Sequence, residues 1–258
     1  WHAEPSDEIP SNKDFRQYAQ EVRDICQNLY PDDSTLAGRT LRLKQQYFFV
    51  SAGIRAIVKN HLRVYPSLSN FHEKNVIQLN DTHPVLAIPE LMRILIDEYD
   101  MEWDEAWHIT SHTCAYTNHT ILSEALEKWP VSTMETLLPR IYQIIEEINR
   151  RFIGYVKQVS DHDDDLLNRV MIIKDGQVFM AHLAIVGSFS VNGVARLHTQ
   201  ILKEQEMKDM LMEIAAEEFN HMEMIGITIQ MLKGENTAHK HSNFLVQSPF
   251  GFVNMDGV

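Results

Sequence analysis

Apolar side chains recur every three or four residues along much of the chain, which is the spacing of one face of an α-helix. In residues 13–29 they form a single stripe, and in 36–64 they predict one long, largely buried helix. A further long helix is expected over 131–156, where Pro139 should kink it or end an early turn. A shorter helix is expected over 102–111, with acidic residues in its first turn.

Short β-branched runs lie between these helices. Residues 76–79 predict a buried strand, and residues 113–117 predict a second one. A Lys-Asp-Gly turn at 174–176 predicts a β-hairpin. Because strands alternate with helices, the pattern favours an α/β fold for about residues 1–210.

The composition narrows the class of protein. Of 258 residues, 44% are hydrophobic and 23% are charged, which is typical of folded globular proteins. No run of about 18 apolar residues occurs, so no transmembrane helix and no membrane partner are expected. With 23 Lys and Arg against 36 Asp and Glu, the net charge of −13 argues against nucleic acid as a partner. Cys26 and Cys114 are too few for a disulfide scaffold, which favours a reducing, cytoplasmic location.

Asp81 and His83 come directly after the first predicted strand. Residues 80–84 read Asn-Asp-Thr-His-Pro, in which Pro84 suits the first turn of a helix and Thr82 suits its N-cap. Ligands bind at such strand-to-helix junctions in open α/β sheets. Both side chains can hydrogen-bond to sugar hydroxyls. The alternative is structural: Asp81 and Thr82 cap the helix, and His83 only completes a turn.

His119 and Asn192 occupy similar places further along the chain. His119 is flanked by small hydrogen-bonding residues within 116–120, which suits recognition of a polyhydroxyl compound. Asn192 precedes Gly193 in a turn that is expected to open a helix, where its amide can face a ligand. The structural alternatives are a histidine held by its neighbours and an asparagine that only forms the turn.

Two patterns could hold a metal ion. Glu218 and His221 are three positions apart on a Met-rich helix expected over 210–232, so both project from one face, as in ferritin-like di-metal proteins. A dinuclear centre needs further ligands from other helices, and a chance pair on an acidic helix is the alternative. The acidic run 161–165 is the other candidate, although such runs more often form a solvated loop.

Several longer blocks carry a family resemblance. These are LYPDDS (29–34), LRLKQQYF (41–48), QLNDTHP (78–84), AIPELMR (87–93), AYTNHT (115–120), EALEKWP (124–130) and VNGVAR (191–196). Together they resemble the α-glucan (glycogen and maltodextrin) phosphorylases, in family order and with family spacing over about residues 1–210. The resemblance implies a partial phosphorylase-type glycosyltransferase domain.

Family members cleave the terminal α-1,4-glucosidic bond of an α-glucan with inorganic phosphate and release glucose 1-phosphate. By position, the resemblance implies that Asp81 and His83 line the glucosyl pocket, and that His119 and Asn192 bind the sugar. It places Asp33 on a gate loop. The substrate-binding candidates are therefore these five residues, and the four other than Asp33 are also the catalytic candidates. Homo-oligomers are a further possibility.

The resemblance also implies pyridoxal phosphate as the cofactor, acting through its phosphate group. The family holds this cofactor on a lysine in a Gly-Thr-x-Asn-Met-Lys type motif, and the 258 residues contain no such motif. The basic phosphate-binding residues of the family are also absent. We therefore expect this chain to form one wall of the active site and to be inactive alone.

Residues 208–235 resemble a different family. The segment IAAEEFNHMEMIG (214–226) is similar to the second core helix of manganese catalases, in which residues matching Glu218 and His221 bind manganese. This divides the chain into 1–210 and a helix with an irregular tail over 211–258. Three interpretations follow: a phosphorylase fragment, which is favoured, a manganese catalase-like protein that decomposes hydrogen peroxide, and a chimera without function.

Overall fold

The computed structural model describes residues 2–6, 14–28, 31–119, 126–159 and 164–194, and the account below refers to them. The helix expected over 210–232 lies outside this part of the chain. None of the helices within it combines the length and the apolar character that a membrane crossing needs.

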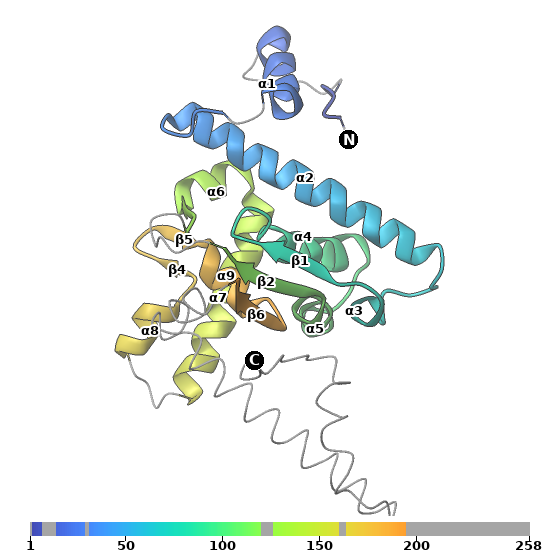
Figure 1. Ribbon diagram of the computed structural model, residues 1–258, viewed down its shortest axis with the longest axis vertical. Helices are drawn as coiled ribbons and strands as arrows, with labels where there is room; N and C mark the ends of the chain where they lie inside the picture. The colour runs from blue at the N-terminus through green and yellow to red at the C-terminus, as the bar shows by residue number, and fades with distance from the viewer. Residues whose placement is uncertain (1, 7–13, 29–30, 120–125, 160–163, 195–258) are drawn as a thin grey trace, which may run out of the picture.

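A three-stranded parallel sheet lies at the centre of the molecule (Figure 1). Its strands are β1 (Ile77–Asn80), β2 (Cys114–Asn118) and β6 (Ser190–Gly193), in the order β1-β2-β6. Parallel neighbours need crossover connections, and helices supply them here. The α/β expectation is thereby confirmed.

The first crossover, from β1 to β2, contains three helical elements. These are α4 (Ala87–Arg93), the π-helical segment η1 (Ile94–Glu98) and α5 (Trp103–Thr113). The sequence predicted that the first helix would begin near Pro84 with Thr82 as its N-cap, and this was wrong. Consecutive tight turns fill residues 82–86, and α4 begins only at Ala87.

The second crossover, from β2 to β6, is longer and contains a small antiparallel sheet of order β3-β5-β4. Its elements are β3 (Lys128–Pro130), α6 (Val131–Leu137), α7 (Pro139–Val159), α8 (Asp164–Val170), β4 (Ile173–Lys174), β5 (Gln177–Phe179) and α9 (Met180–Val186). Asp175 and Gly176 join β4 to β5 with φ angles of 51° and 69°, the left-handed pair that a tight hairpin turn requires. The hairpin expectation is confirmed.

Pro139 divides the long helix expected over 131–156. The backbone leaves the helical region at Leu138, where φ is −135° and ψ is 57°, and α7 begins at the proline. A proline clashes with a helical conformation of the residue before it, and it suits the first position of a new helix. Of the two expectations for Pro139, the ending of an early turn is therefore the one observed.

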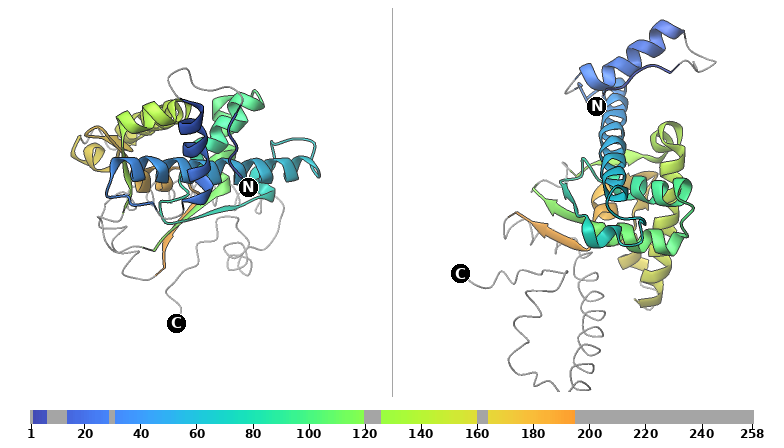
Figure 2. Two further views of the ribbon diagram at one scale, coloured as in Figure 1. Left: turned by 90° about the horizontal axis from the view of Figure 1, so that it is seen from above. Right: turned by 90° about the vertical axis from the view of Figure 1, so that its right-hand side faces the viewer.

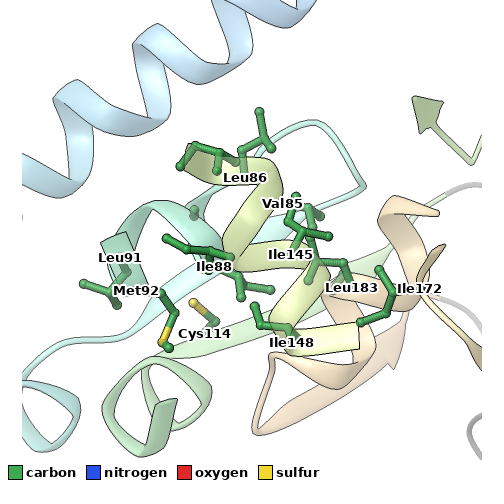
Figure 3. Close-up of a cluster of buried hydrophobic side chains, with 14 of the residues drawn as sticks. Val85, Leu86, Ile88, Leu91, Met92, Cys114, Ile145, Ile148, Ile172 and Leu183 are labelled. Atoms are coloured by element: carbon green, nitrogen blue, oxygen red, sulfur yellow. The ribbon is translucent and has the colours of Figure 1, made fainter. Parts of the chain in front are cut away.

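The core is centred on α4, which is buried on all sides. Each residue from Ala87 to Met92 is buried, and α2, α5 and α7 surround the helix. Figure 3 shows side chains of α4, β2, α7 and α9 meeting in this cluster. A helix that is mostly apolar on every side belongs in the interior. Its two charged residues pair with each other, since Arg93 Nε lies 2.8 Å from Glu90 Oε2, and Tyr47 and Ser51 also donate to the Glu90 carboxylate.

Three helices precede the sheet: α1 (Phe15–Gln27), α2 (Leu36–Leu62) and α3 (Phe71–Lys74). Figures 1 and 2 show α1 on the side of α2 that faces away from the sheet. The expectation that 36–64 is largely buried was wrong, because few residues of α2 are buried. Leu43, Ile54, Val58 and His61 form one buried stripe, and Gln45 is buried on the opposite face, where it donates to carbonyls of α1 and its C-cap.

The strand expected at 76–79 is found at β1, but it is not buried along its length. Val76, just before β1, is 64% exposed, and Leu79 is fully buried. Within β1, Gln78 and Asn80 are exposed, so only one face of this strand is covered. The second strand, expected at 113–117, is β2, which lies between two neighbours and is mostly buried.

Candidate functional site at the sheet edge

The carboxyl ends of all three parallel strands meet at one edge of the sheet. Asp81 follows β1, His119 follows β2, and Asn192 lies near the end of β6. The register pairs Asn80 with Thr117 and Thr117 with Asn192, so the strands end at similar heights. Three of the candidate residues are thereby brought together from distant parts of the sequence.

Asp81 holds an unusual backbone conformation at this edge. Its φ angle is 59°, in the left-handed region that residues other than glycine rarely occupy, although aspartate tolerates it better than most. The Asp81 N–H donates to the Thr117 carbonyl at 2.9 Å. The His119 N–H donates to Asp81 Oδ1 at 2.7 Å, and His119 Nδ1 lies 3.6 Å from the same oxygen. The carboxylate is therefore held toward the end of β2.

Asn192 belongs to a line of polar side chains across the sheet. Thr117 Oγ1 donates to Asn192 Oδ1 at 2.8 Å and accepts from Gln78 Nε2 at 2.9 Å. The amide oxygen of Asn192 thus accepts from Thr117, so the NH₂ group is the part of this side chain that can donate to a ligand. The expected turn at Asn192 was wrong: the residue lies in β6, because its backbone pairs with β2.

His83 lies in a second group of polar residues, beside Glu127. The Nδ1 atom of His83 is 3.4 Å from Glu127 Oε1 and 3.3 Å from Arg42 Nη2. Gln46 Nε2 donates to the same Glu127 oxygen at 2.9 Å. Thr82, expected as a helix cap, is instead buried with its Oγ1 3.4 Å from Glu127 Oε2. Residues 82 and 83 therefore both face Glu127.

Arg42 connects this group to the segment that carries Asp33. One guanidinium nitrogen donates to Asp33 Oδ2 at 2.6 Å, and the other lies 3.2 Å from Glu127 Oε1. Asp33 itself comes just before α2, in a turn where Thr35 caps the helix through a bond from the Gly38 N–H. All five substrate-binding candidates therefore lie in two adjoining groups.

The charges in the second group are coupled. The hydrogen bond with Glu127 raises the pKa of His83, against the opposing effects of burial and of Arg42. Burial by itself would raise the pKa of Glu127, but His83, Gln46 and Arg42 outweigh it and hold that pKa below its usual range. Glu127 is therefore ionised at neutral pH, and Asp81 adds to the attraction for a proton on His83.

Five residues of the two groups were not singled out in the sequence. They all lie within the blocks that resemble phosphorylases, but no local pattern marks them: Arg42, Gln46, Gln78, Thr117 and Glu127. Gln46 and Glu127 are 81 positions apart, and their contact depends on α2 crossing the start of β3. Burial of a charged residue such as Glu127 could have been the signal, but burial is visible only in three dimensions.

The two metal-binding candidates can be compared with the structure only in part. Glu218 and His221 lie outside the described residues, so their manganese role stays a prediction. Of the acidic run 161–165, only Asp164 and Asp165 are described, and they form the first turn of α8. Within the described ranges, no group of three His, Cys, Asp or Glu side chains is arranged to hold a metal ion.

The two groups present several hydrogen-bond acceptors and few free cations. Asp33, Asp81 and Glu127 are acidic, and the one arginine among them is already paired with two of these carboxylates. Such an arrangement suits a neutral compound with many hydroxyl groups, whereas it would repel a phosphate group.

Comparison with known proteins agrees with the family that the sequence blocks resemble. A sequence profile described as carbohydrate phosphorylase matches residues 1–236. Glycogen phosphorylase of Bacillus subtilis is 54% identical over 209 residues, which cover 81% of this chain and 26% of that protein. The muscle form of human glycogen phosphorylase is 49% identical over 216 residues, covering 76% of this chain and 26% of its own length. The chain spans about a quarter of these relatives, and it belongs to the carbohydrate phosphorylase family.

Proposed function

We propose that the sheet edge binds the terminal glucosyl unit of an α-1,4-glucan during phosphorolysis to glucose 1-phosphate. The observation that carries this proposal is the meeting of Asp81, His119 and Asn192 at the carboxyl ends of three parallel strands. Ligands of open parallel sheets bind at that edge. The curated relatives are named glycogen phosphorylases, which agrees with a glucan as the ligand.

The proposed roles follow from the hydrogen bonds described above. Asp81 accepts from a sugar hydroxyl, and its carboxylate is oriented beforehand by the His119 N–H. Asn192 donates through its amide NH₂, since its oxygen is already engaged by Thr117. His83 contributes its imidazole, and the adjacent Glu127 favours the protonated form of this ring. These residues orient the sugar, and orientation is the main contribution of a protein to a cofactor-dependent reaction.

Pyridoxal phosphate, which supplies acid–base chemistry through its phosphate when bound in this family, does not fit the described groups. They contain no lysine, and their arginine is paired with Asp33 and Glu127. We therefore assign no residue of this chain to the cofactor or to inorganic phosphate. The 258-residue polypeptide is accordingly proposed to lack phosphorolysis by itself, and a homo-oligomeric, cytoplasmic enzyme is proposed for the complete site.

The manganese catalase-like interpretation has no further support. It rests on residues 208–235, and the carbohydrate phosphorylase profile extends to residue 236, which includes Glu218 and His221. The manganese content of the purified protein would test it directly: bound manganese would support the interpretation, and its absence would contradict it. The chimera interpretation is tested by a tryptic peptide covering 209–233, which spans the proposed junction and has no internal Lys or Arg.

Binding provides the test of the glucan proposal, because it does not require the cofactor. Maltoheptaose would be titrated into ¹⁵N-labelled protein, and chemical-shift changes would be followed by NMR. We expect changes at His119, Asp81 and Asn192, and their loss in Asn192→Ala. Gln143→Ala, on the exposed side of α7, is the matched control and should leave the changes intact. Shift changes confined to other parts of the chain would refute the proposal.

A further inference from the structure

One face of the central sheet carries a continuous chain of hydrogen-bonded polar side chains. Successive side chains of a strand point to opposite faces of the sheet, and the buried Leu79 and Tyr116 occupy the face that packs on the helices. Gln78, Thr117 and Asn192 lie on the other face, as the strand register requires. They come from β1, β2 and β6, which lie side by side in Figure 1, so the chain crosses the whole sheet.

A backbone carbonyl fixes the direction of this chain at its first end. Gln78 Nε2 donates to the Ala115 carbonyl at 3.3 Å and to Thr117 Oγ1 at 2.9 Å. Because a carbonyl oxygen only accepts, the nitrogen of the Gln78 amide, and not its oxygen, must face β2. Thr117 therefore accepts from Gln78, which leaves its own hydroxyl proton to be donated elsewhere.

The Thr117 hydroxyl passes this direction on to Asn192. It donates to Asn192 Oδ1 at 2.8 Å, and Asn192 Nδ2 lies 3.4 Å from the Gly193 carbonyl. A reversed Asn192 amide would set its oxygen against that carbonyl and would leave the Thr117 proton without an acceptor in the chain. Asn192 is exposed and its NH₂ group has two protons, so one of them remains for a ligand.

We propose that Gln78 and Thr117 are positioning residues, which hold the Asn192 amide so that its NH₂ group is presented to the ligand. This inference rests on the proposed function, in which Asn192 donates to the glucosyl unit. An asparagine amide that is free to turn over presents a donor in one orientation and an acceptor in the other. Fixing the amide before the sugar arrives removes the cost of ordering this side chain during binding.

The ¹³Cγ signal of Asn192 in the full-length chain without ligand tests the positioning role by NMR. A hydrogen bond accepted by Oδ1 moves this signal downfield. Thr117→Val removes the donor, and Gln78→Glu replaces the amide nitrogen by an oxygen that draws the Thr117 proton to itself. We expect an upfield shift in both variants, whereas Thr117→Ser retains the hydroxyl and should retain the wild-type signal.

Ser190 provides the matched control on the same strand. It lies two positions before Asn192, on the same face of β6 and paired with Ala115, and it takes no part in the chain of hydrogen bonds described above. Ser190→Ala should therefore leave the Asn192 signal in place. Gln78 is exposed, so Gln78→Glu tests the chain even where Thr117→Val impairs folding.

Titration of the same variants with maltoheptaose measures the consequence for binding. Thr117→Val and Gln78→Glu should each raise the Kd about three- to tenfold, which corresponds to the loss of one hydrogen bond. Thr117→Ser should restore the wild-type Kd, and Ser190→Ala should not alter it. Since a change that only weakens the sheet would not follow the hydroxyl group, recovery in Thr117→Ser separates positioning from a merely structural role.

The outcomes distinguish this inference from the function on which it rests. An unchanged Asn192 signal in both Thr117→Val and Gln78→Glu would overturn the positioning role, and so would an altered signal with an unchanged Kd. Failure of the wild type to bind maltoheptaose would overturn the proposed function instead. The ligand-free signal would still decide in that case whether Gln78 and Thr117 hold the amide.

Discussion

Arg42 holds Asp33 and Glu127 together, with one guanidinium nitrogen 2.6 Å from Asp33 and the other 3.2 Å from Glu127. Asp33 precedes α2 and Glu127 precedes β3, so a single side chain near the start of α2 connects two loops of the candidate site. Glu127 is only 13% exposed, whereas Asp33 is 55% exposed. The contact of Arg42 with Asp33 and its contact with Glu127 must therefore differ in strength.

Replacement of Arg42 by Gln should expose that difference. We expect the exposed contact with Asp33 to contribute about 0–1 kcal/mol, because solvent screens it. The contact with Glu127 should contribute more, since a poorly solvated carboxylate loses a charge partner. Urea unfolding of Arg42→Gln and of Asp33→Asn would separate the two contributions. Equal losses in both variants would contradict the expected order.

Glu90 should be far less tolerant of substitution than the surface charges. It is fully buried and accepts from Tyr47 Oη at 2.9 Å, from Ser51 Oγ at 2.6 Å and from Arg93 at 2.8 Å. Glu90→Gln removes one of the two carboxylates that pair with Arg93 and leaves Glu98, 2.8 Å from Arg93 Nη2, as the other, so it should cost about 1.5–3 kcal/mol of unfolding free energy.

Tyr47→Phe is the matched comparison for Glu90→Gln. It removes one hydrogen bond and retains the ion pair, so a loss of about 1 kcal/mol is expected. Burial, with the adjacent Glu90, raises the pKa of Tyr47 to about 12, so the phenol stays neutral throughout the measurement. A Tyr47→Phe loss as large as that of Glu90→Gln would show that the carboxylate is not the centre of this network.

His83 should make folding stability depend on pH. Its pKa is raised in the folded state, so its contribution is fully present below the unfolded value of about 6.5 and is lost as the pH rises through the folded value. NMR titration should give a pKa for His83 above the usual value, and Glu127→Gln should return it toward that value. A pKa that does not respond to Glu127→Gln would exclude the assigned partner.

Glu127 should act in the opposite direction at lower pH. Its pKa is depressed, so its contribution is present above the unfolded value and disappears as the pH falls through the folded value. Acid titration of the unfolding free energy in the wild type and in Glu127→Gln would show the difference. The two curves should converge once the carboxyl is protonated.

Two glycines are expected to respond to alanine with opposite signs. A Cβ at Gly187 would lie 2.7 Å from Ile88 Cδ1 in the packed core, so Gly187→Ala should cost about 1–3 kcal/mol through overpacking. A Cβ at Gly154, within α7, would meet nothing within 4 Å, so Gly154→Ala should stabilise by about 0.5–1 kcal/mol. Thermal unfolding of the two variants checks both signs at once, and a shift of the same sign in both would contradict them.

The sequence predicted elements well where the signal was local. The hairpin at 174–176 was found because Asp and Gly tolerate positive φ angles, and the division at Pro139 follows from proline geometry. The start of α4 was predicted too early, because the Thr82 hydroxyl lies against Glu127, from another part of the chain, and does not cap the helix. Asn192 was assigned to a turn because the pairing of β6 with β2 cannot be read from neighbouring residues.

The sequence by itself determined the family, the alternation of strands and helices, and the candidates Asp33, Asp81, His83, His119 and Asn192. Only the tertiary structure decided how these residues group. It placed Arg42, Glu127 and Thr117 among them. The physical reason is that periodicity and turn chemistry act over a few residues, whereas charge pairing and burial depend on segments that meet only after folding.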